Sequence, residues 1–395
     1  MLEKRYLFDY VLDDLEEKMV FIGGPRQVGK TTLARDIIGE TFSNITYLNW
    51  DFSDDRKKIL NLLFSPDSQL IILDEIHKYR NWKNFLKGVY DKKKDEFKVL
   101  VTGSARLNIF RKGGDSLMGR NFYYRLHPFS LGELSGTRVK KDFKVMEMLE
   151  IPPPGKNQVD FLNTLFKFGG FPEPLLKQNE RTLRRWHHMR LERITKEDIL
   201  GVENISDLSK LQILVDHLPD KVASLLSINS LTEDLSVSHK TLGRWLNILE
   251  NIYYHFRIYP YTGSSLRSLK KMPKMYLWDW SQIENNEGAK LENMIACHLL
   301  KFCDFLTDTD GYKMKLYYLR DIERREVDFL ITVSEKPWFA VEVKRSSKSI
   351  SSHLKYFMNR MEIPYLFQVV MDEDVDFMAH GIRVISASRF LAALV

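Results

Sequence analysis

Cysteine is scarce in this sequence of 395 residues, which has only Cys297 and Cys303. The two lie six positions apart in a segment that reads as a helix, so they occupy different faces of it. No second pair lies nearby, and neither a disulfide framework nor a zinc site is expected. We interpret both residues as buried thiols of a protein in a reducing cytoplasm.

Long apolar runs are also missing. No run approaches the roughly 20 residues that a membrane-spanning helix needs. Residues 1–5 include the charged Glu3, Lys4 and Arg5 and lack the apolar core of a signal peptide. Internal repeats and low-complexity tracts are absent as well. We therefore expect a cytoplasmic protein with no membrane partner.

A strong excess of one charge is the third absence. The formal net charge is +6, which permits contact with nucleic acid but does not demand it, because such binding depends on a clustered basic face. Hydrophobic residues make up 44% and charged residues 28%, as is ordinary for soluble globular proteins. At about 150 residues per domain, the length predicts two or three domains.

The first third of the chain alternates short apolar runs with helical stretches. The alternation predicts βαβ units and a parallel sheet, and thus an α/β domain over residues 1–135. A helix is expected from about Lys30 to Ile38, directly after the first strand. The expected strands cover residues 19–22, 45–50, 69–73, 97–102 and 121–126.

The middle of the chain, residues 136–260, reads as helical and winged-helix. A proline-rich connector at 151–155 precedes a helical pattern from 159 to 227. Two short amphipathic helices then flank a turn at 236–238, with Ser238 placed to cap the second helix, and the β-rich run 253–259 is the expected wing. The second helix offers Lys240 and Arg244 for contacts in a DNA groove. The alternative is a winged helix that packs against protein.

One segment, Gly24–Thr31, matches the pattern G-x-x-x-x-G-K-T between a predicted strand and a predicted helix. In such a loop the backbone N–H groups and the helix N-terminus hold the phosphates of a nucleotide. We expect Lys30 to reach the β- and γ-phosphates and the Thr31 hydroxyl to bind Mg²⁺. Gly24, Gly29 and Thr32 complete the predicted ATP-binding set.

A second signal follows the strand at 69–73, which ends in two carboxylates. Asp74 is expected to hold the Mg²⁺ ion through water, as a Walker B aspartate does. Glu75 is then placed to act as the general base that polarises the attacking water. In series with the phosphate loop, this pair indicates hydrolysis of the β–γ phosphoanhydride and not binding alone.

Two further groups are needed near the γ-phosphate. The strand at 97–102 is followed by Ser104, which we expect to sense the γ-phosphate or orient the water. An arginine must also neutralise charge on the transferring phosphoryl group. Of Arg106, Arg111 and Arg120 we favour Arg120, because it directly precedes a predicted strand.

The last third, residues 261–395, carries a separate set of carboxylates. Its predicted order is a helix at 287–301, strands at 314–320, 327–333 and 338–344, a helix at 350–359 and a strand at 365–370. Asp328 lies on one strand, and alternation puts Glu342 and Lys344 on one face of the next.

Two carboxylates that face each other can hold a divalent metal, with the lysine activating a water. Glu292 on the preceding helix is the fourth candidate. The pattern looks like the PD-(D/E)xK nuclease core. The alternative is a solvated strand face, since E-x-K is common by chance.

Several motifs are spread along the chain: GPRQVGKTTL from Gly24, LDEIHK from Leu73 with Trp82 downstream, TGS from Thr102, Gly119-Arg120, Pro128-Phe129-Ser130 with Glu133, and GGFPE from Gly169. Together they resemble a large prokaryotic family of AAA+-type ATPases, and the resemblance covers nearly the whole chain. It implies a P-loop ATPase module, a winged-helix middle and a C-terminal domain of the restriction-endonuclease-like type.

The sequence therefore predicts a Mg²⁺-dependent ATPase whose activity drives or gates the other half of the chain. Two hypotheses remain for that half. It is either a metal-dependent nuclease acting on DNA, or a nucleotide-dependent switch that binds DNA or protein without cutting. A homo-oligomer is expected by analogy alone, since an arginine finger is often supplied by a neighbouring subunit.

Overall fold

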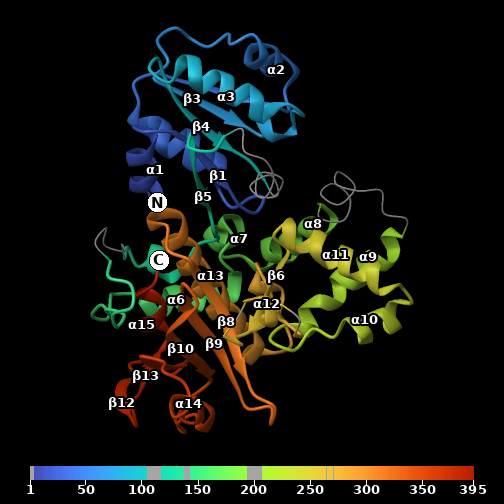
Figure 1. The fold of residues 1–395 in the computed structure, drawn as a ribbon, viewed down its shortest axis with the longest axis vertical. Coiled ribbons are helices and arrows are strands. Elements are labelled where there is room, and N and C mark those ends of the chain that lie inside the picture. The colour runs from blue at the N-terminus through green and yellow to red at the C-terminus, as the bar shows by residue number, and fades with distance from the viewer. Residues whose placement is uncertain (1–3, 105–116, 138–142, 194–206, 264, 270) are drawn as a thin grey trace. The chain divides into compact units, whose positions relative to one another are not determined.

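The computed structural model describes residues 4–104, 117–137, 143–193, 207–263, 265–269 and 271–395. The chain forms two compact units (Figure 1). Unit 1 comprises residues 1–128 with 251–253, and unit 2 comprises residues 129–250 and 254–395. Each unit combines helices with a sheet, which confirms the expected multidomain α/β fold class. The finer division into 1–135, 136–260 and 261–395 stays a prediction.

The sheet of unit 1 has five strands in the order β2-β3-β4-β1-β5, all parallel to their neighbours. Every strand lies within one or two residues of its predicted position. The central strands β1 and β3 are buried along their whole length because both faces of a parallel sheet are covered. The strands are β1 (Met19–Gly23), β2 (Ile45–Asn49), β3 (Leu70–Asp74), β4 (Lys98–Thr102) and β5 (Asn121–Arg125).

Helices and short helical turns connect these strands. The helix predicted from Lys30 to Ile38 is present and is wound as a π-helix over most of its length. On α3, Trp82 and Leu86 pack into the core of the unit, where Trp82 contacts Phe21 with ring centroids 5.9 Å apart. The elements are α1 (Phe8–Leu15), η1 (Thr32–Ile38), η2 (Gly39–Thr41), α2 (Ser53–Leu60), η3 (Ile76–Lys78) and α3 (Trp82–Lys93).

The first half of unit 2 is helical, as predicted. Helices α10 and α11 flank the Ser236–Ser238 turn, and the Ser238 hydroxyl accepts a hydrogen bond from the N–H of Thr241 at 3.1 Å, which is the expected cap. The elements are α5 (Leu131–Leu134), α6 (Gln158–Phe168), α7 (Pro172–Lys177), α8 (Glu180–Arg193), α9 (Leu208–His217), η5 (Leu218–Lys221), α10 (Ile228–Leu235) and α11 (His239–Asn251).

The second half of unit 2 is built on a sheet of eight strands in the order β12-β13-β11-β10-β9-β8-β6-β7. The predicted order of helix, three strands, helix and strand is present from α13 to β11. The elements are β6 (His255–Pro260), α12 (Ser265–Ser268), β7 (Lys274–Leu277), η6 (Trp280–Gln282), α13 (Glu287–Asp310), β8 (Met314–Arg320), β9 (Glu326–Val333), β10 (Lys336–Lys344), α14 (Ser352–Met358), β11 (Tyr365–Val370), β12 (Asp376–Ala379), β13 (Ile382–Ser386) and α15 (Ala387–Ala392).

The run expected as a wing joins this large sheet. Strand β6 pairs with β7 in antiparallel fashion and with β8 in parallel fashion. Strand β6 is therefore part of the eight-stranded sheet, whereas the strand of an isolated wing would not pair with β8.

Helix α13 is the longest helix of unit 2 that the structure describes and packs against β7 to β10. The Asn286 side chain caps its N-terminus by accepting from the N–H of Ala289 at 3.0 Å, and Gly311, at φ +74°, ends it. Cys297 and Cys303 are both buried in it, and neither is in a disulfide. Within the described ranges no helix is long and apolar enough to cross a membrane.

Candidate functional site

The phosphate loop leaves β1 at Gly23 and enters the helical turns that begin at Lys30. Gly24 and Gly29 have φ values of +149° and +97°, which L side chains rarely adopt. A Cβ on Gly24 would also lie 2.4 Å from the carbonyl oxygen of Leu126. Glycine is therefore required at Gly24 by both its backbone conformation and the lack of space for a side chain. Thr32 is the first residue of η1, which follows the loop directly.

The side chain of Lys30 lies folded over the loop. Its ammonium donates to the carbonyl oxygens of Gly24 at 3.0 Å and Pro25 at 2.6 Å, and the residue is 8% exposed. The neighbouring Thr31 hydroxyl donates to Asp74 at 2.9 Å. The geometry thus joins the loop to the end of β3, as the two motifs predicted.

Asp74 is the centre of a small hydrogen-bond network. Besides Thr31, it accepts from the hydroxyl of Tyr47 on β2 at 2.9 Å and from that of Thr102 on β4 at 2.6 Å. Burial, and then the charge of Asp74, raise the pKa of Tyr47 to about 12, so Tyr47 keeps its proton and remains a donor. Three neutral hydroxyls therefore fix the carboxylate in one orientation.

Sequence reasoning missed Tyr47 and Thr102 as members of this network. Each lies near the carboxyl end of a strand that neighbours β3, where parallel strands bring their ends together. Thr102 could have been predicted to contact Asp74, because it is a polar residue at the end of an apolar run. For Tyr47 the order of the strands had to be known as well, because the local sequence does not show that β2 lies beside β3.

Glu75 follows Asp74 with a backbone φ of +57°, an uncommon value for a residue other than glycine. Its N–H donates to the carbonyl of Thr102 at 2.9 Å, which holds this conformation in place. The carboxylate lies 3.3 Å from the ammonium of Lys78 and 3.5 Å from Nε2 of His77. Strain of this kind is typical of functional positions.

Ser104 lies just beyond β4, the strand between β1 and β3. The N–H of the preceding Gly103 donates to the carbonyl of Ile22 at 3.2 Å, so this segment approaches the end of β1 where the phosphate loop starts. Ser104 itself is 8% exposed. Ser104 is thus brought to the same edge of the sheet as Lys30, Asp74 and Glu75.

Arg120 is not brought to that edge. Its carbonyl accepts from the N–H of Met19, the first residue of β1, whereas the phosphate loop follows the last residue of that strand. The guanidinium instead pairs with Asp91, with Nε 2.7 Å and Nη2 3.1 Å from the two carboxylate oxygens. A residue before a parallel strand lies at the opposite edge from a residue after one, so Arg120 cannot reach the nucleotide of its own chain.

The other two candidates, Arg106 and Arg111, lie outside the described residues. A cavity of about 580 Å³ lies at the same edge as Arg120, since Met19, Gln69 and Lys98 line it at the starts of the strands. It is distinct from the phosphate loop.

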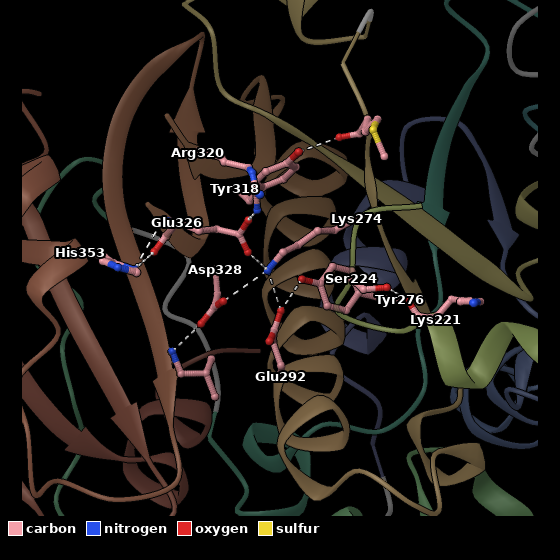
Figure 2. A network of polar contacts seen from close by, with 12 residues as sticks. Lys221, Ser224, Lys274, Tyr276, Glu292, Tyr318, Arg320, Glu326, Asp328 and His353 are labelled. Atoms are coloured by element: carbon pink, nitrogen blue, oxygen red, sulfur yellow. Dashed lines mark hydrogen bonds and ion pairs between the residues drawn. The ribbon is translucent and has the colours of Figure 1, made fainter. Parts of the chain in front are cut away.

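The C-terminal carboxylates gather in unit 2 on α13, β9 and β10, and Figure 2 shows Glu292 and Asp328 among them. Asp328 accepts from the N–H of Val343 at 2.9 Å, which places it against the strand that carries Glu342. Glu342 is 6% exposed, accepts from the Ser351 hydroxyl at 3.2 Å, and lies 3.4 Å from the Lys344 ammonium. Burial, followed by the charge of Asp328, raises the pKa of Glu342 to about 8.

A lysine that sequence reasoning missed lies within this cluster. The ammonium of Lys274, from β7, is 2.6 Å from Glu326, 3.1 Å from Glu292 and 3.4 Å from Asp328 (Figure 2). Burial opposes the charge of Lys274, but the three carboxylates outweigh burial and raise its pKa. One ammonium faces three carboxylates, and burial together with the charge of Asp328 raises the pKa of Glu292 to about 8.

The predicted metal site of unit 2 consists of Glu292, Asp328 and Glu342, with Lys344 beside them. Among the residues that the structure describes, no group of three or more histidine, cysteine, aspartate or glutamate side chains is placed to hold a metal ion. Glu292 and Asp328 both turn toward Lys274 (Figure 2). The residues present therefore do not fit the divalent metal that the PD-(D/E)xK pattern implies.

The predicted DNA contacts lie on α11. Lys240 and Arg244 are exposed, on the side opposite the buried residues of the helix. Residues at i, i+4 share one face of a helix, so both side chains belong to a single exposed surface. The buried face consists of Leu242, Trp245, Leu246, Ile248 and Leu249.

Three family models match successive parts of the chain. Residues 16–135 match the model described as "AAA domain". Residues 160–284 match a domain of unknown function, DUF8612, and residues 287–390 match another, DUF4143. The match at 16–135 supports a P-loop ATPase of the AAA type in unit 1, and the other two name no activity.

Curated relatives resemble most of the chain at low identity. The uncharacterized protein MJ1544 of Methanocaldococcus jannaschii is 25% identical, and the alignment covers 84% of this chain and 80% of that protein. The uncharacterized protein Rv2008c of Mycobacterium tuberculosis is 23% identical over 85% of this chain and 73% of its own length. The same order of domains is therefore expected in these relatives.

A solved structure of the Thermotoga maritima RuvB Holliday junction branch migration motor aligns with 63% of this chain and 87% of its own, at 15% identity and a TM-score of 0.30. Another, of Caenorhabditis elegans PCH-2, aligns with 61% of this chain and 66% of its own, at 12% identity and a TM-score of 0.23. Over residues 16–135 the chain is similar to AAA domains, and over most of unit 2 it is similar to families without an assigned activity.

Proposed function

We propose that unit 1 binds ATP with Mg²⁺ and hydrolyses its β–γ phosphoanhydride bond. The observation that supports this most directly is the 2.9 Å hydrogen bond between Thr31 and Asp74. It places a hydroxyl of the phosphate loop and a carboxylate of β3 where both can serve one Mg²⁺ ion, directly or through water. The match of this region to an AAA domain agrees with the proposal.

Each residue of the site then has a distinct role. Gly24, Gly29 and Thr32 shape the loop around the phosphates, while Lys30 leaves its loop carbonyls to contact the β- and γ-phosphates. Glu75 polarises the attacking water, and Ser104 orients it or senses the γ-phosphate. Bound Mg²⁺ supplies neutralisation of phosphate charge. The arginine that completes the charge balance comes from elsewhere than Arg120 of the same chain.

Replacement of Lys30 by Ala tests this proposal. The variant loses the lysine that we expect to reach the β- and γ-phosphates, so ATP hydrolysis should fall by about 100-fold. Phosphate release is measured at saturating Mg²⁺–ATP, with Lys87→Ala, an exposed lysine on α3, as the matched control. Wild-type hydrolysis by Lys30→Ala would exclude the phosphate loop as the site.

For unit 2 we propose a nucleotide-dependent switch that associates with DNA through α11. The exposed pair Lys240 and Arg244 supports this choice, since both side chains face outward from a helix that follows a short turn. The competing hypothesis, a nuclease at Asp328, Glu342 and Lys344, is weakened because the carboxylates do not fit a metal. On this proposal ATP sets how unit 2 engages its partner, and no phosphodiester is cut.

Salt dependence tests the DNA contact. A double Lys240→Ala/Arg244→Ala variant loses two phosphate contacts. The negative slope of the logarithm of the DNA-binding constant against log[salt] should therefore become less steep by about 2. Fluorescence anisotropy with a duplex, with and without ATP, gives the slope. The control is Lys313→Ala/Lys336→Ala, two exposed lysines at the ends of β8 and β10. Equal slopes for the α11 variant and wild type would assign α11 to protein packing.

A further inference from the structure

Lys274 is a buried cation in the centre of the C-terminal carboxylates. Its side chain is 3% exposed, although lysine is almost never buried unless it is paired. Figure 2 shows its ammonium between Glu292 of α13 and the two carboxylates of β9, Glu326 and Asp328. Two elements, α13 and β9, thus direct three acidic groups at one nitrogen atom.

The carboxylates around Lys274 have few free positions left for another cation. The hydroxyl of Tyr276 donates to Glu292 at 2.7 Å, and the N–H of Val343 donates to Asp328 at 2.9 Å. Arg320 pairs with Glu326 at 2.5 Å. Each acidic group in contact with Lys274 therefore has a second donor that fixes its orientation toward the ammonium.

A divalent cation at this place would face two obstacles. Mg²⁺ requires six oxygen ligands at about 2.0–2.1 Å, and it would have to enter against the positive charge of Lys274. Two positive charges close together in a buried site repel each other strongly, and a divalent ion doubles the repulsion that a monovalent ion would meet. Electrostatics therefore favours either the lysine or the metal, but not both.

We infer that the ammonium of Lys274 takes the place of a divalent cation between Glu292 and Asp328, so that unit 2 has an ion-paired, metal-free centre. The centre then joins β7, α13 and β9 instead of activating water. Glu342 and Lys344 remain beside it, but without a metal they have nothing to position a hydroxide. The inference does not depend on ATP hydrolysis in unit 1.

Manganese binding tests this inference in the full chain. All proteins carry Asp74→Asn and are kept free of nucleotide, so that the phosphate loop contributes no metal carboxylate. Titration calorimetry with MnCl₂ compares this parent with a Lys274→Ala variant, and Lys271→Ala, an exposed lysine just before β7, is the control. We expect no Mn²⁺ binding in the parent or the control, and one Mn²⁺ site per chain in Lys274→Ala, because this variant leaves the buried carboxylates without their cation.

Two results of the titration would overturn the inference. The first is Mn²⁺ binding by the parent that disappears when Asp328→Asn is added, a comparison that does not require the Lys274 variant to fold. The second is folded Lys274→Ala protein that still binds no Mn²⁺. Plasmid DNA gives an independent readout in Mg²⁺ and Mn²⁺: the wild type should not nick it, and nicking that is lost in Glu342→Ala would equally contradict a metal-free centre.

Discussion

Replacement of Glu75 by Gln is expected to lower the turnover number for ATP hydrolysis by about 100- to 10,000-fold, the range for losing a general base. Binding of ATP should persist, because Glu75 belongs neither to the phosphate loop nor to the Thr31–Asp74 pair. Gln keeps the size of the side chain and its capacity to accept a hydrogen bond, but it cannot take a proton from water.

Two measurements separate the chemical step from binding. Single-turnover hydrolysis of labelled ATP gives the rate, and equilibrium titration with a fluorescent ATP analogue gives the Kd. Glu96→Gln serves as the control, since Glu96 is exposed and pairs only with Lys93 among the ion pairs that the structure describes for it. An unchanged turnover number would assign the base to another group. A Kd that rises together with the loss of turnover would give Glu75 a role in binding.

The position of Glu75 explains why the effect should be large. Its left-handed backbone is held by a hydrogen bond to Thr102, so the side chain starts from a fixed point beside Asp74. Its carboxylate forms an ion pair with the ammonium of Lys78, which also lies 2.6 Å from the carboxylate of Asp51. We expect bound nucleotide to draw Glu75 from this pair toward the water, since the catalytic contacts of an unliganded enzyme are often incomplete.

The N-terminal site could be predicted from sequence to a large extent. Parallel strands bring their carboxyl ends to one edge, so a phosphate loop after one apolar run and Asp74-Glu75 after another had to meet once the runs were recognised as strands. The same rule, applied to the start of a strand, would have placed Arg120 at the other edge. The place of Arg120 before a predicted strand was therefore enough to exclude it from the edge that holds the phosphate loop.

The centre of unit 2 could not be predicted in the same way. Lys274 lies on the four-residue strand β7, 18 positions before Glu292. The spacing of residues along a helix or strand does not indicate that Lys274 contacts carboxylates on α13 and β9. Asp328 and Glu342 were correctly placed on neighbouring strands, because alternation along strands is local. What occupies the space between carboxylates depends on the whole sheet order, with β7 at one edge and α13 across it.

A second large effect is expected where the chain passes from unit 1 into unit 2. Helix α5 begins three residues after Pro128, and it is fixed to α13 by Lys301, whose ammonium contacts the Ser130 hydroxyl at 2.8 Å and the carboxylate of Glu133. Lys301 and Glu133 have side chains only 2% and 3% exposed. The motif of Ser130 and Glu133 seen in the sequence thus serves as the partner of a buried lysine.

A histidine on α13 adds to this anchor. Nε2 of His298 accepts from the N–H of Leu131 at 3.0 Å, while Nδ1 lies 2.8 Å from the carbonyl of Met294. Burial lowers the pKa of His298 to about 4, so the ring is neutral and one nitrogen can accept while the other donates. The first turn of α5 is therefore bound to α13 through both backbone and side chains.

Lys301→Met is expected to reduce the free energy of unfolding of unit 2 by about 3–5 kcal/mol, because it leaves the carboxylate of Glu133 buried without its cation. Denaturant unfolding followed by tryptophan fluorescence measures the change, since Trp186, Trp280 and Trp338 are buried in unit 2. Lys177→Met is the matched control: its pair with Glu173, at 2.9 Å, is exposed, and such pairs contribute at most about 1 kcal/mol.

A double variant distinguishes loss of a partner from loss of packing. If the uncompensated charge of Glu133 is the cause, Lys301→Met/Glu133→Gln should recover part of the stability, and the two substitutions should be strongly non-additive in a double-mutant cycle. Additive losses would instead assign the effect of Lys301→Met to packing around α13. A loss below about 1 kcal/mol for Lys301→Met would mean that water reaches the pair, and α5 would then be held to α13 mainly by the backbone contact to His298.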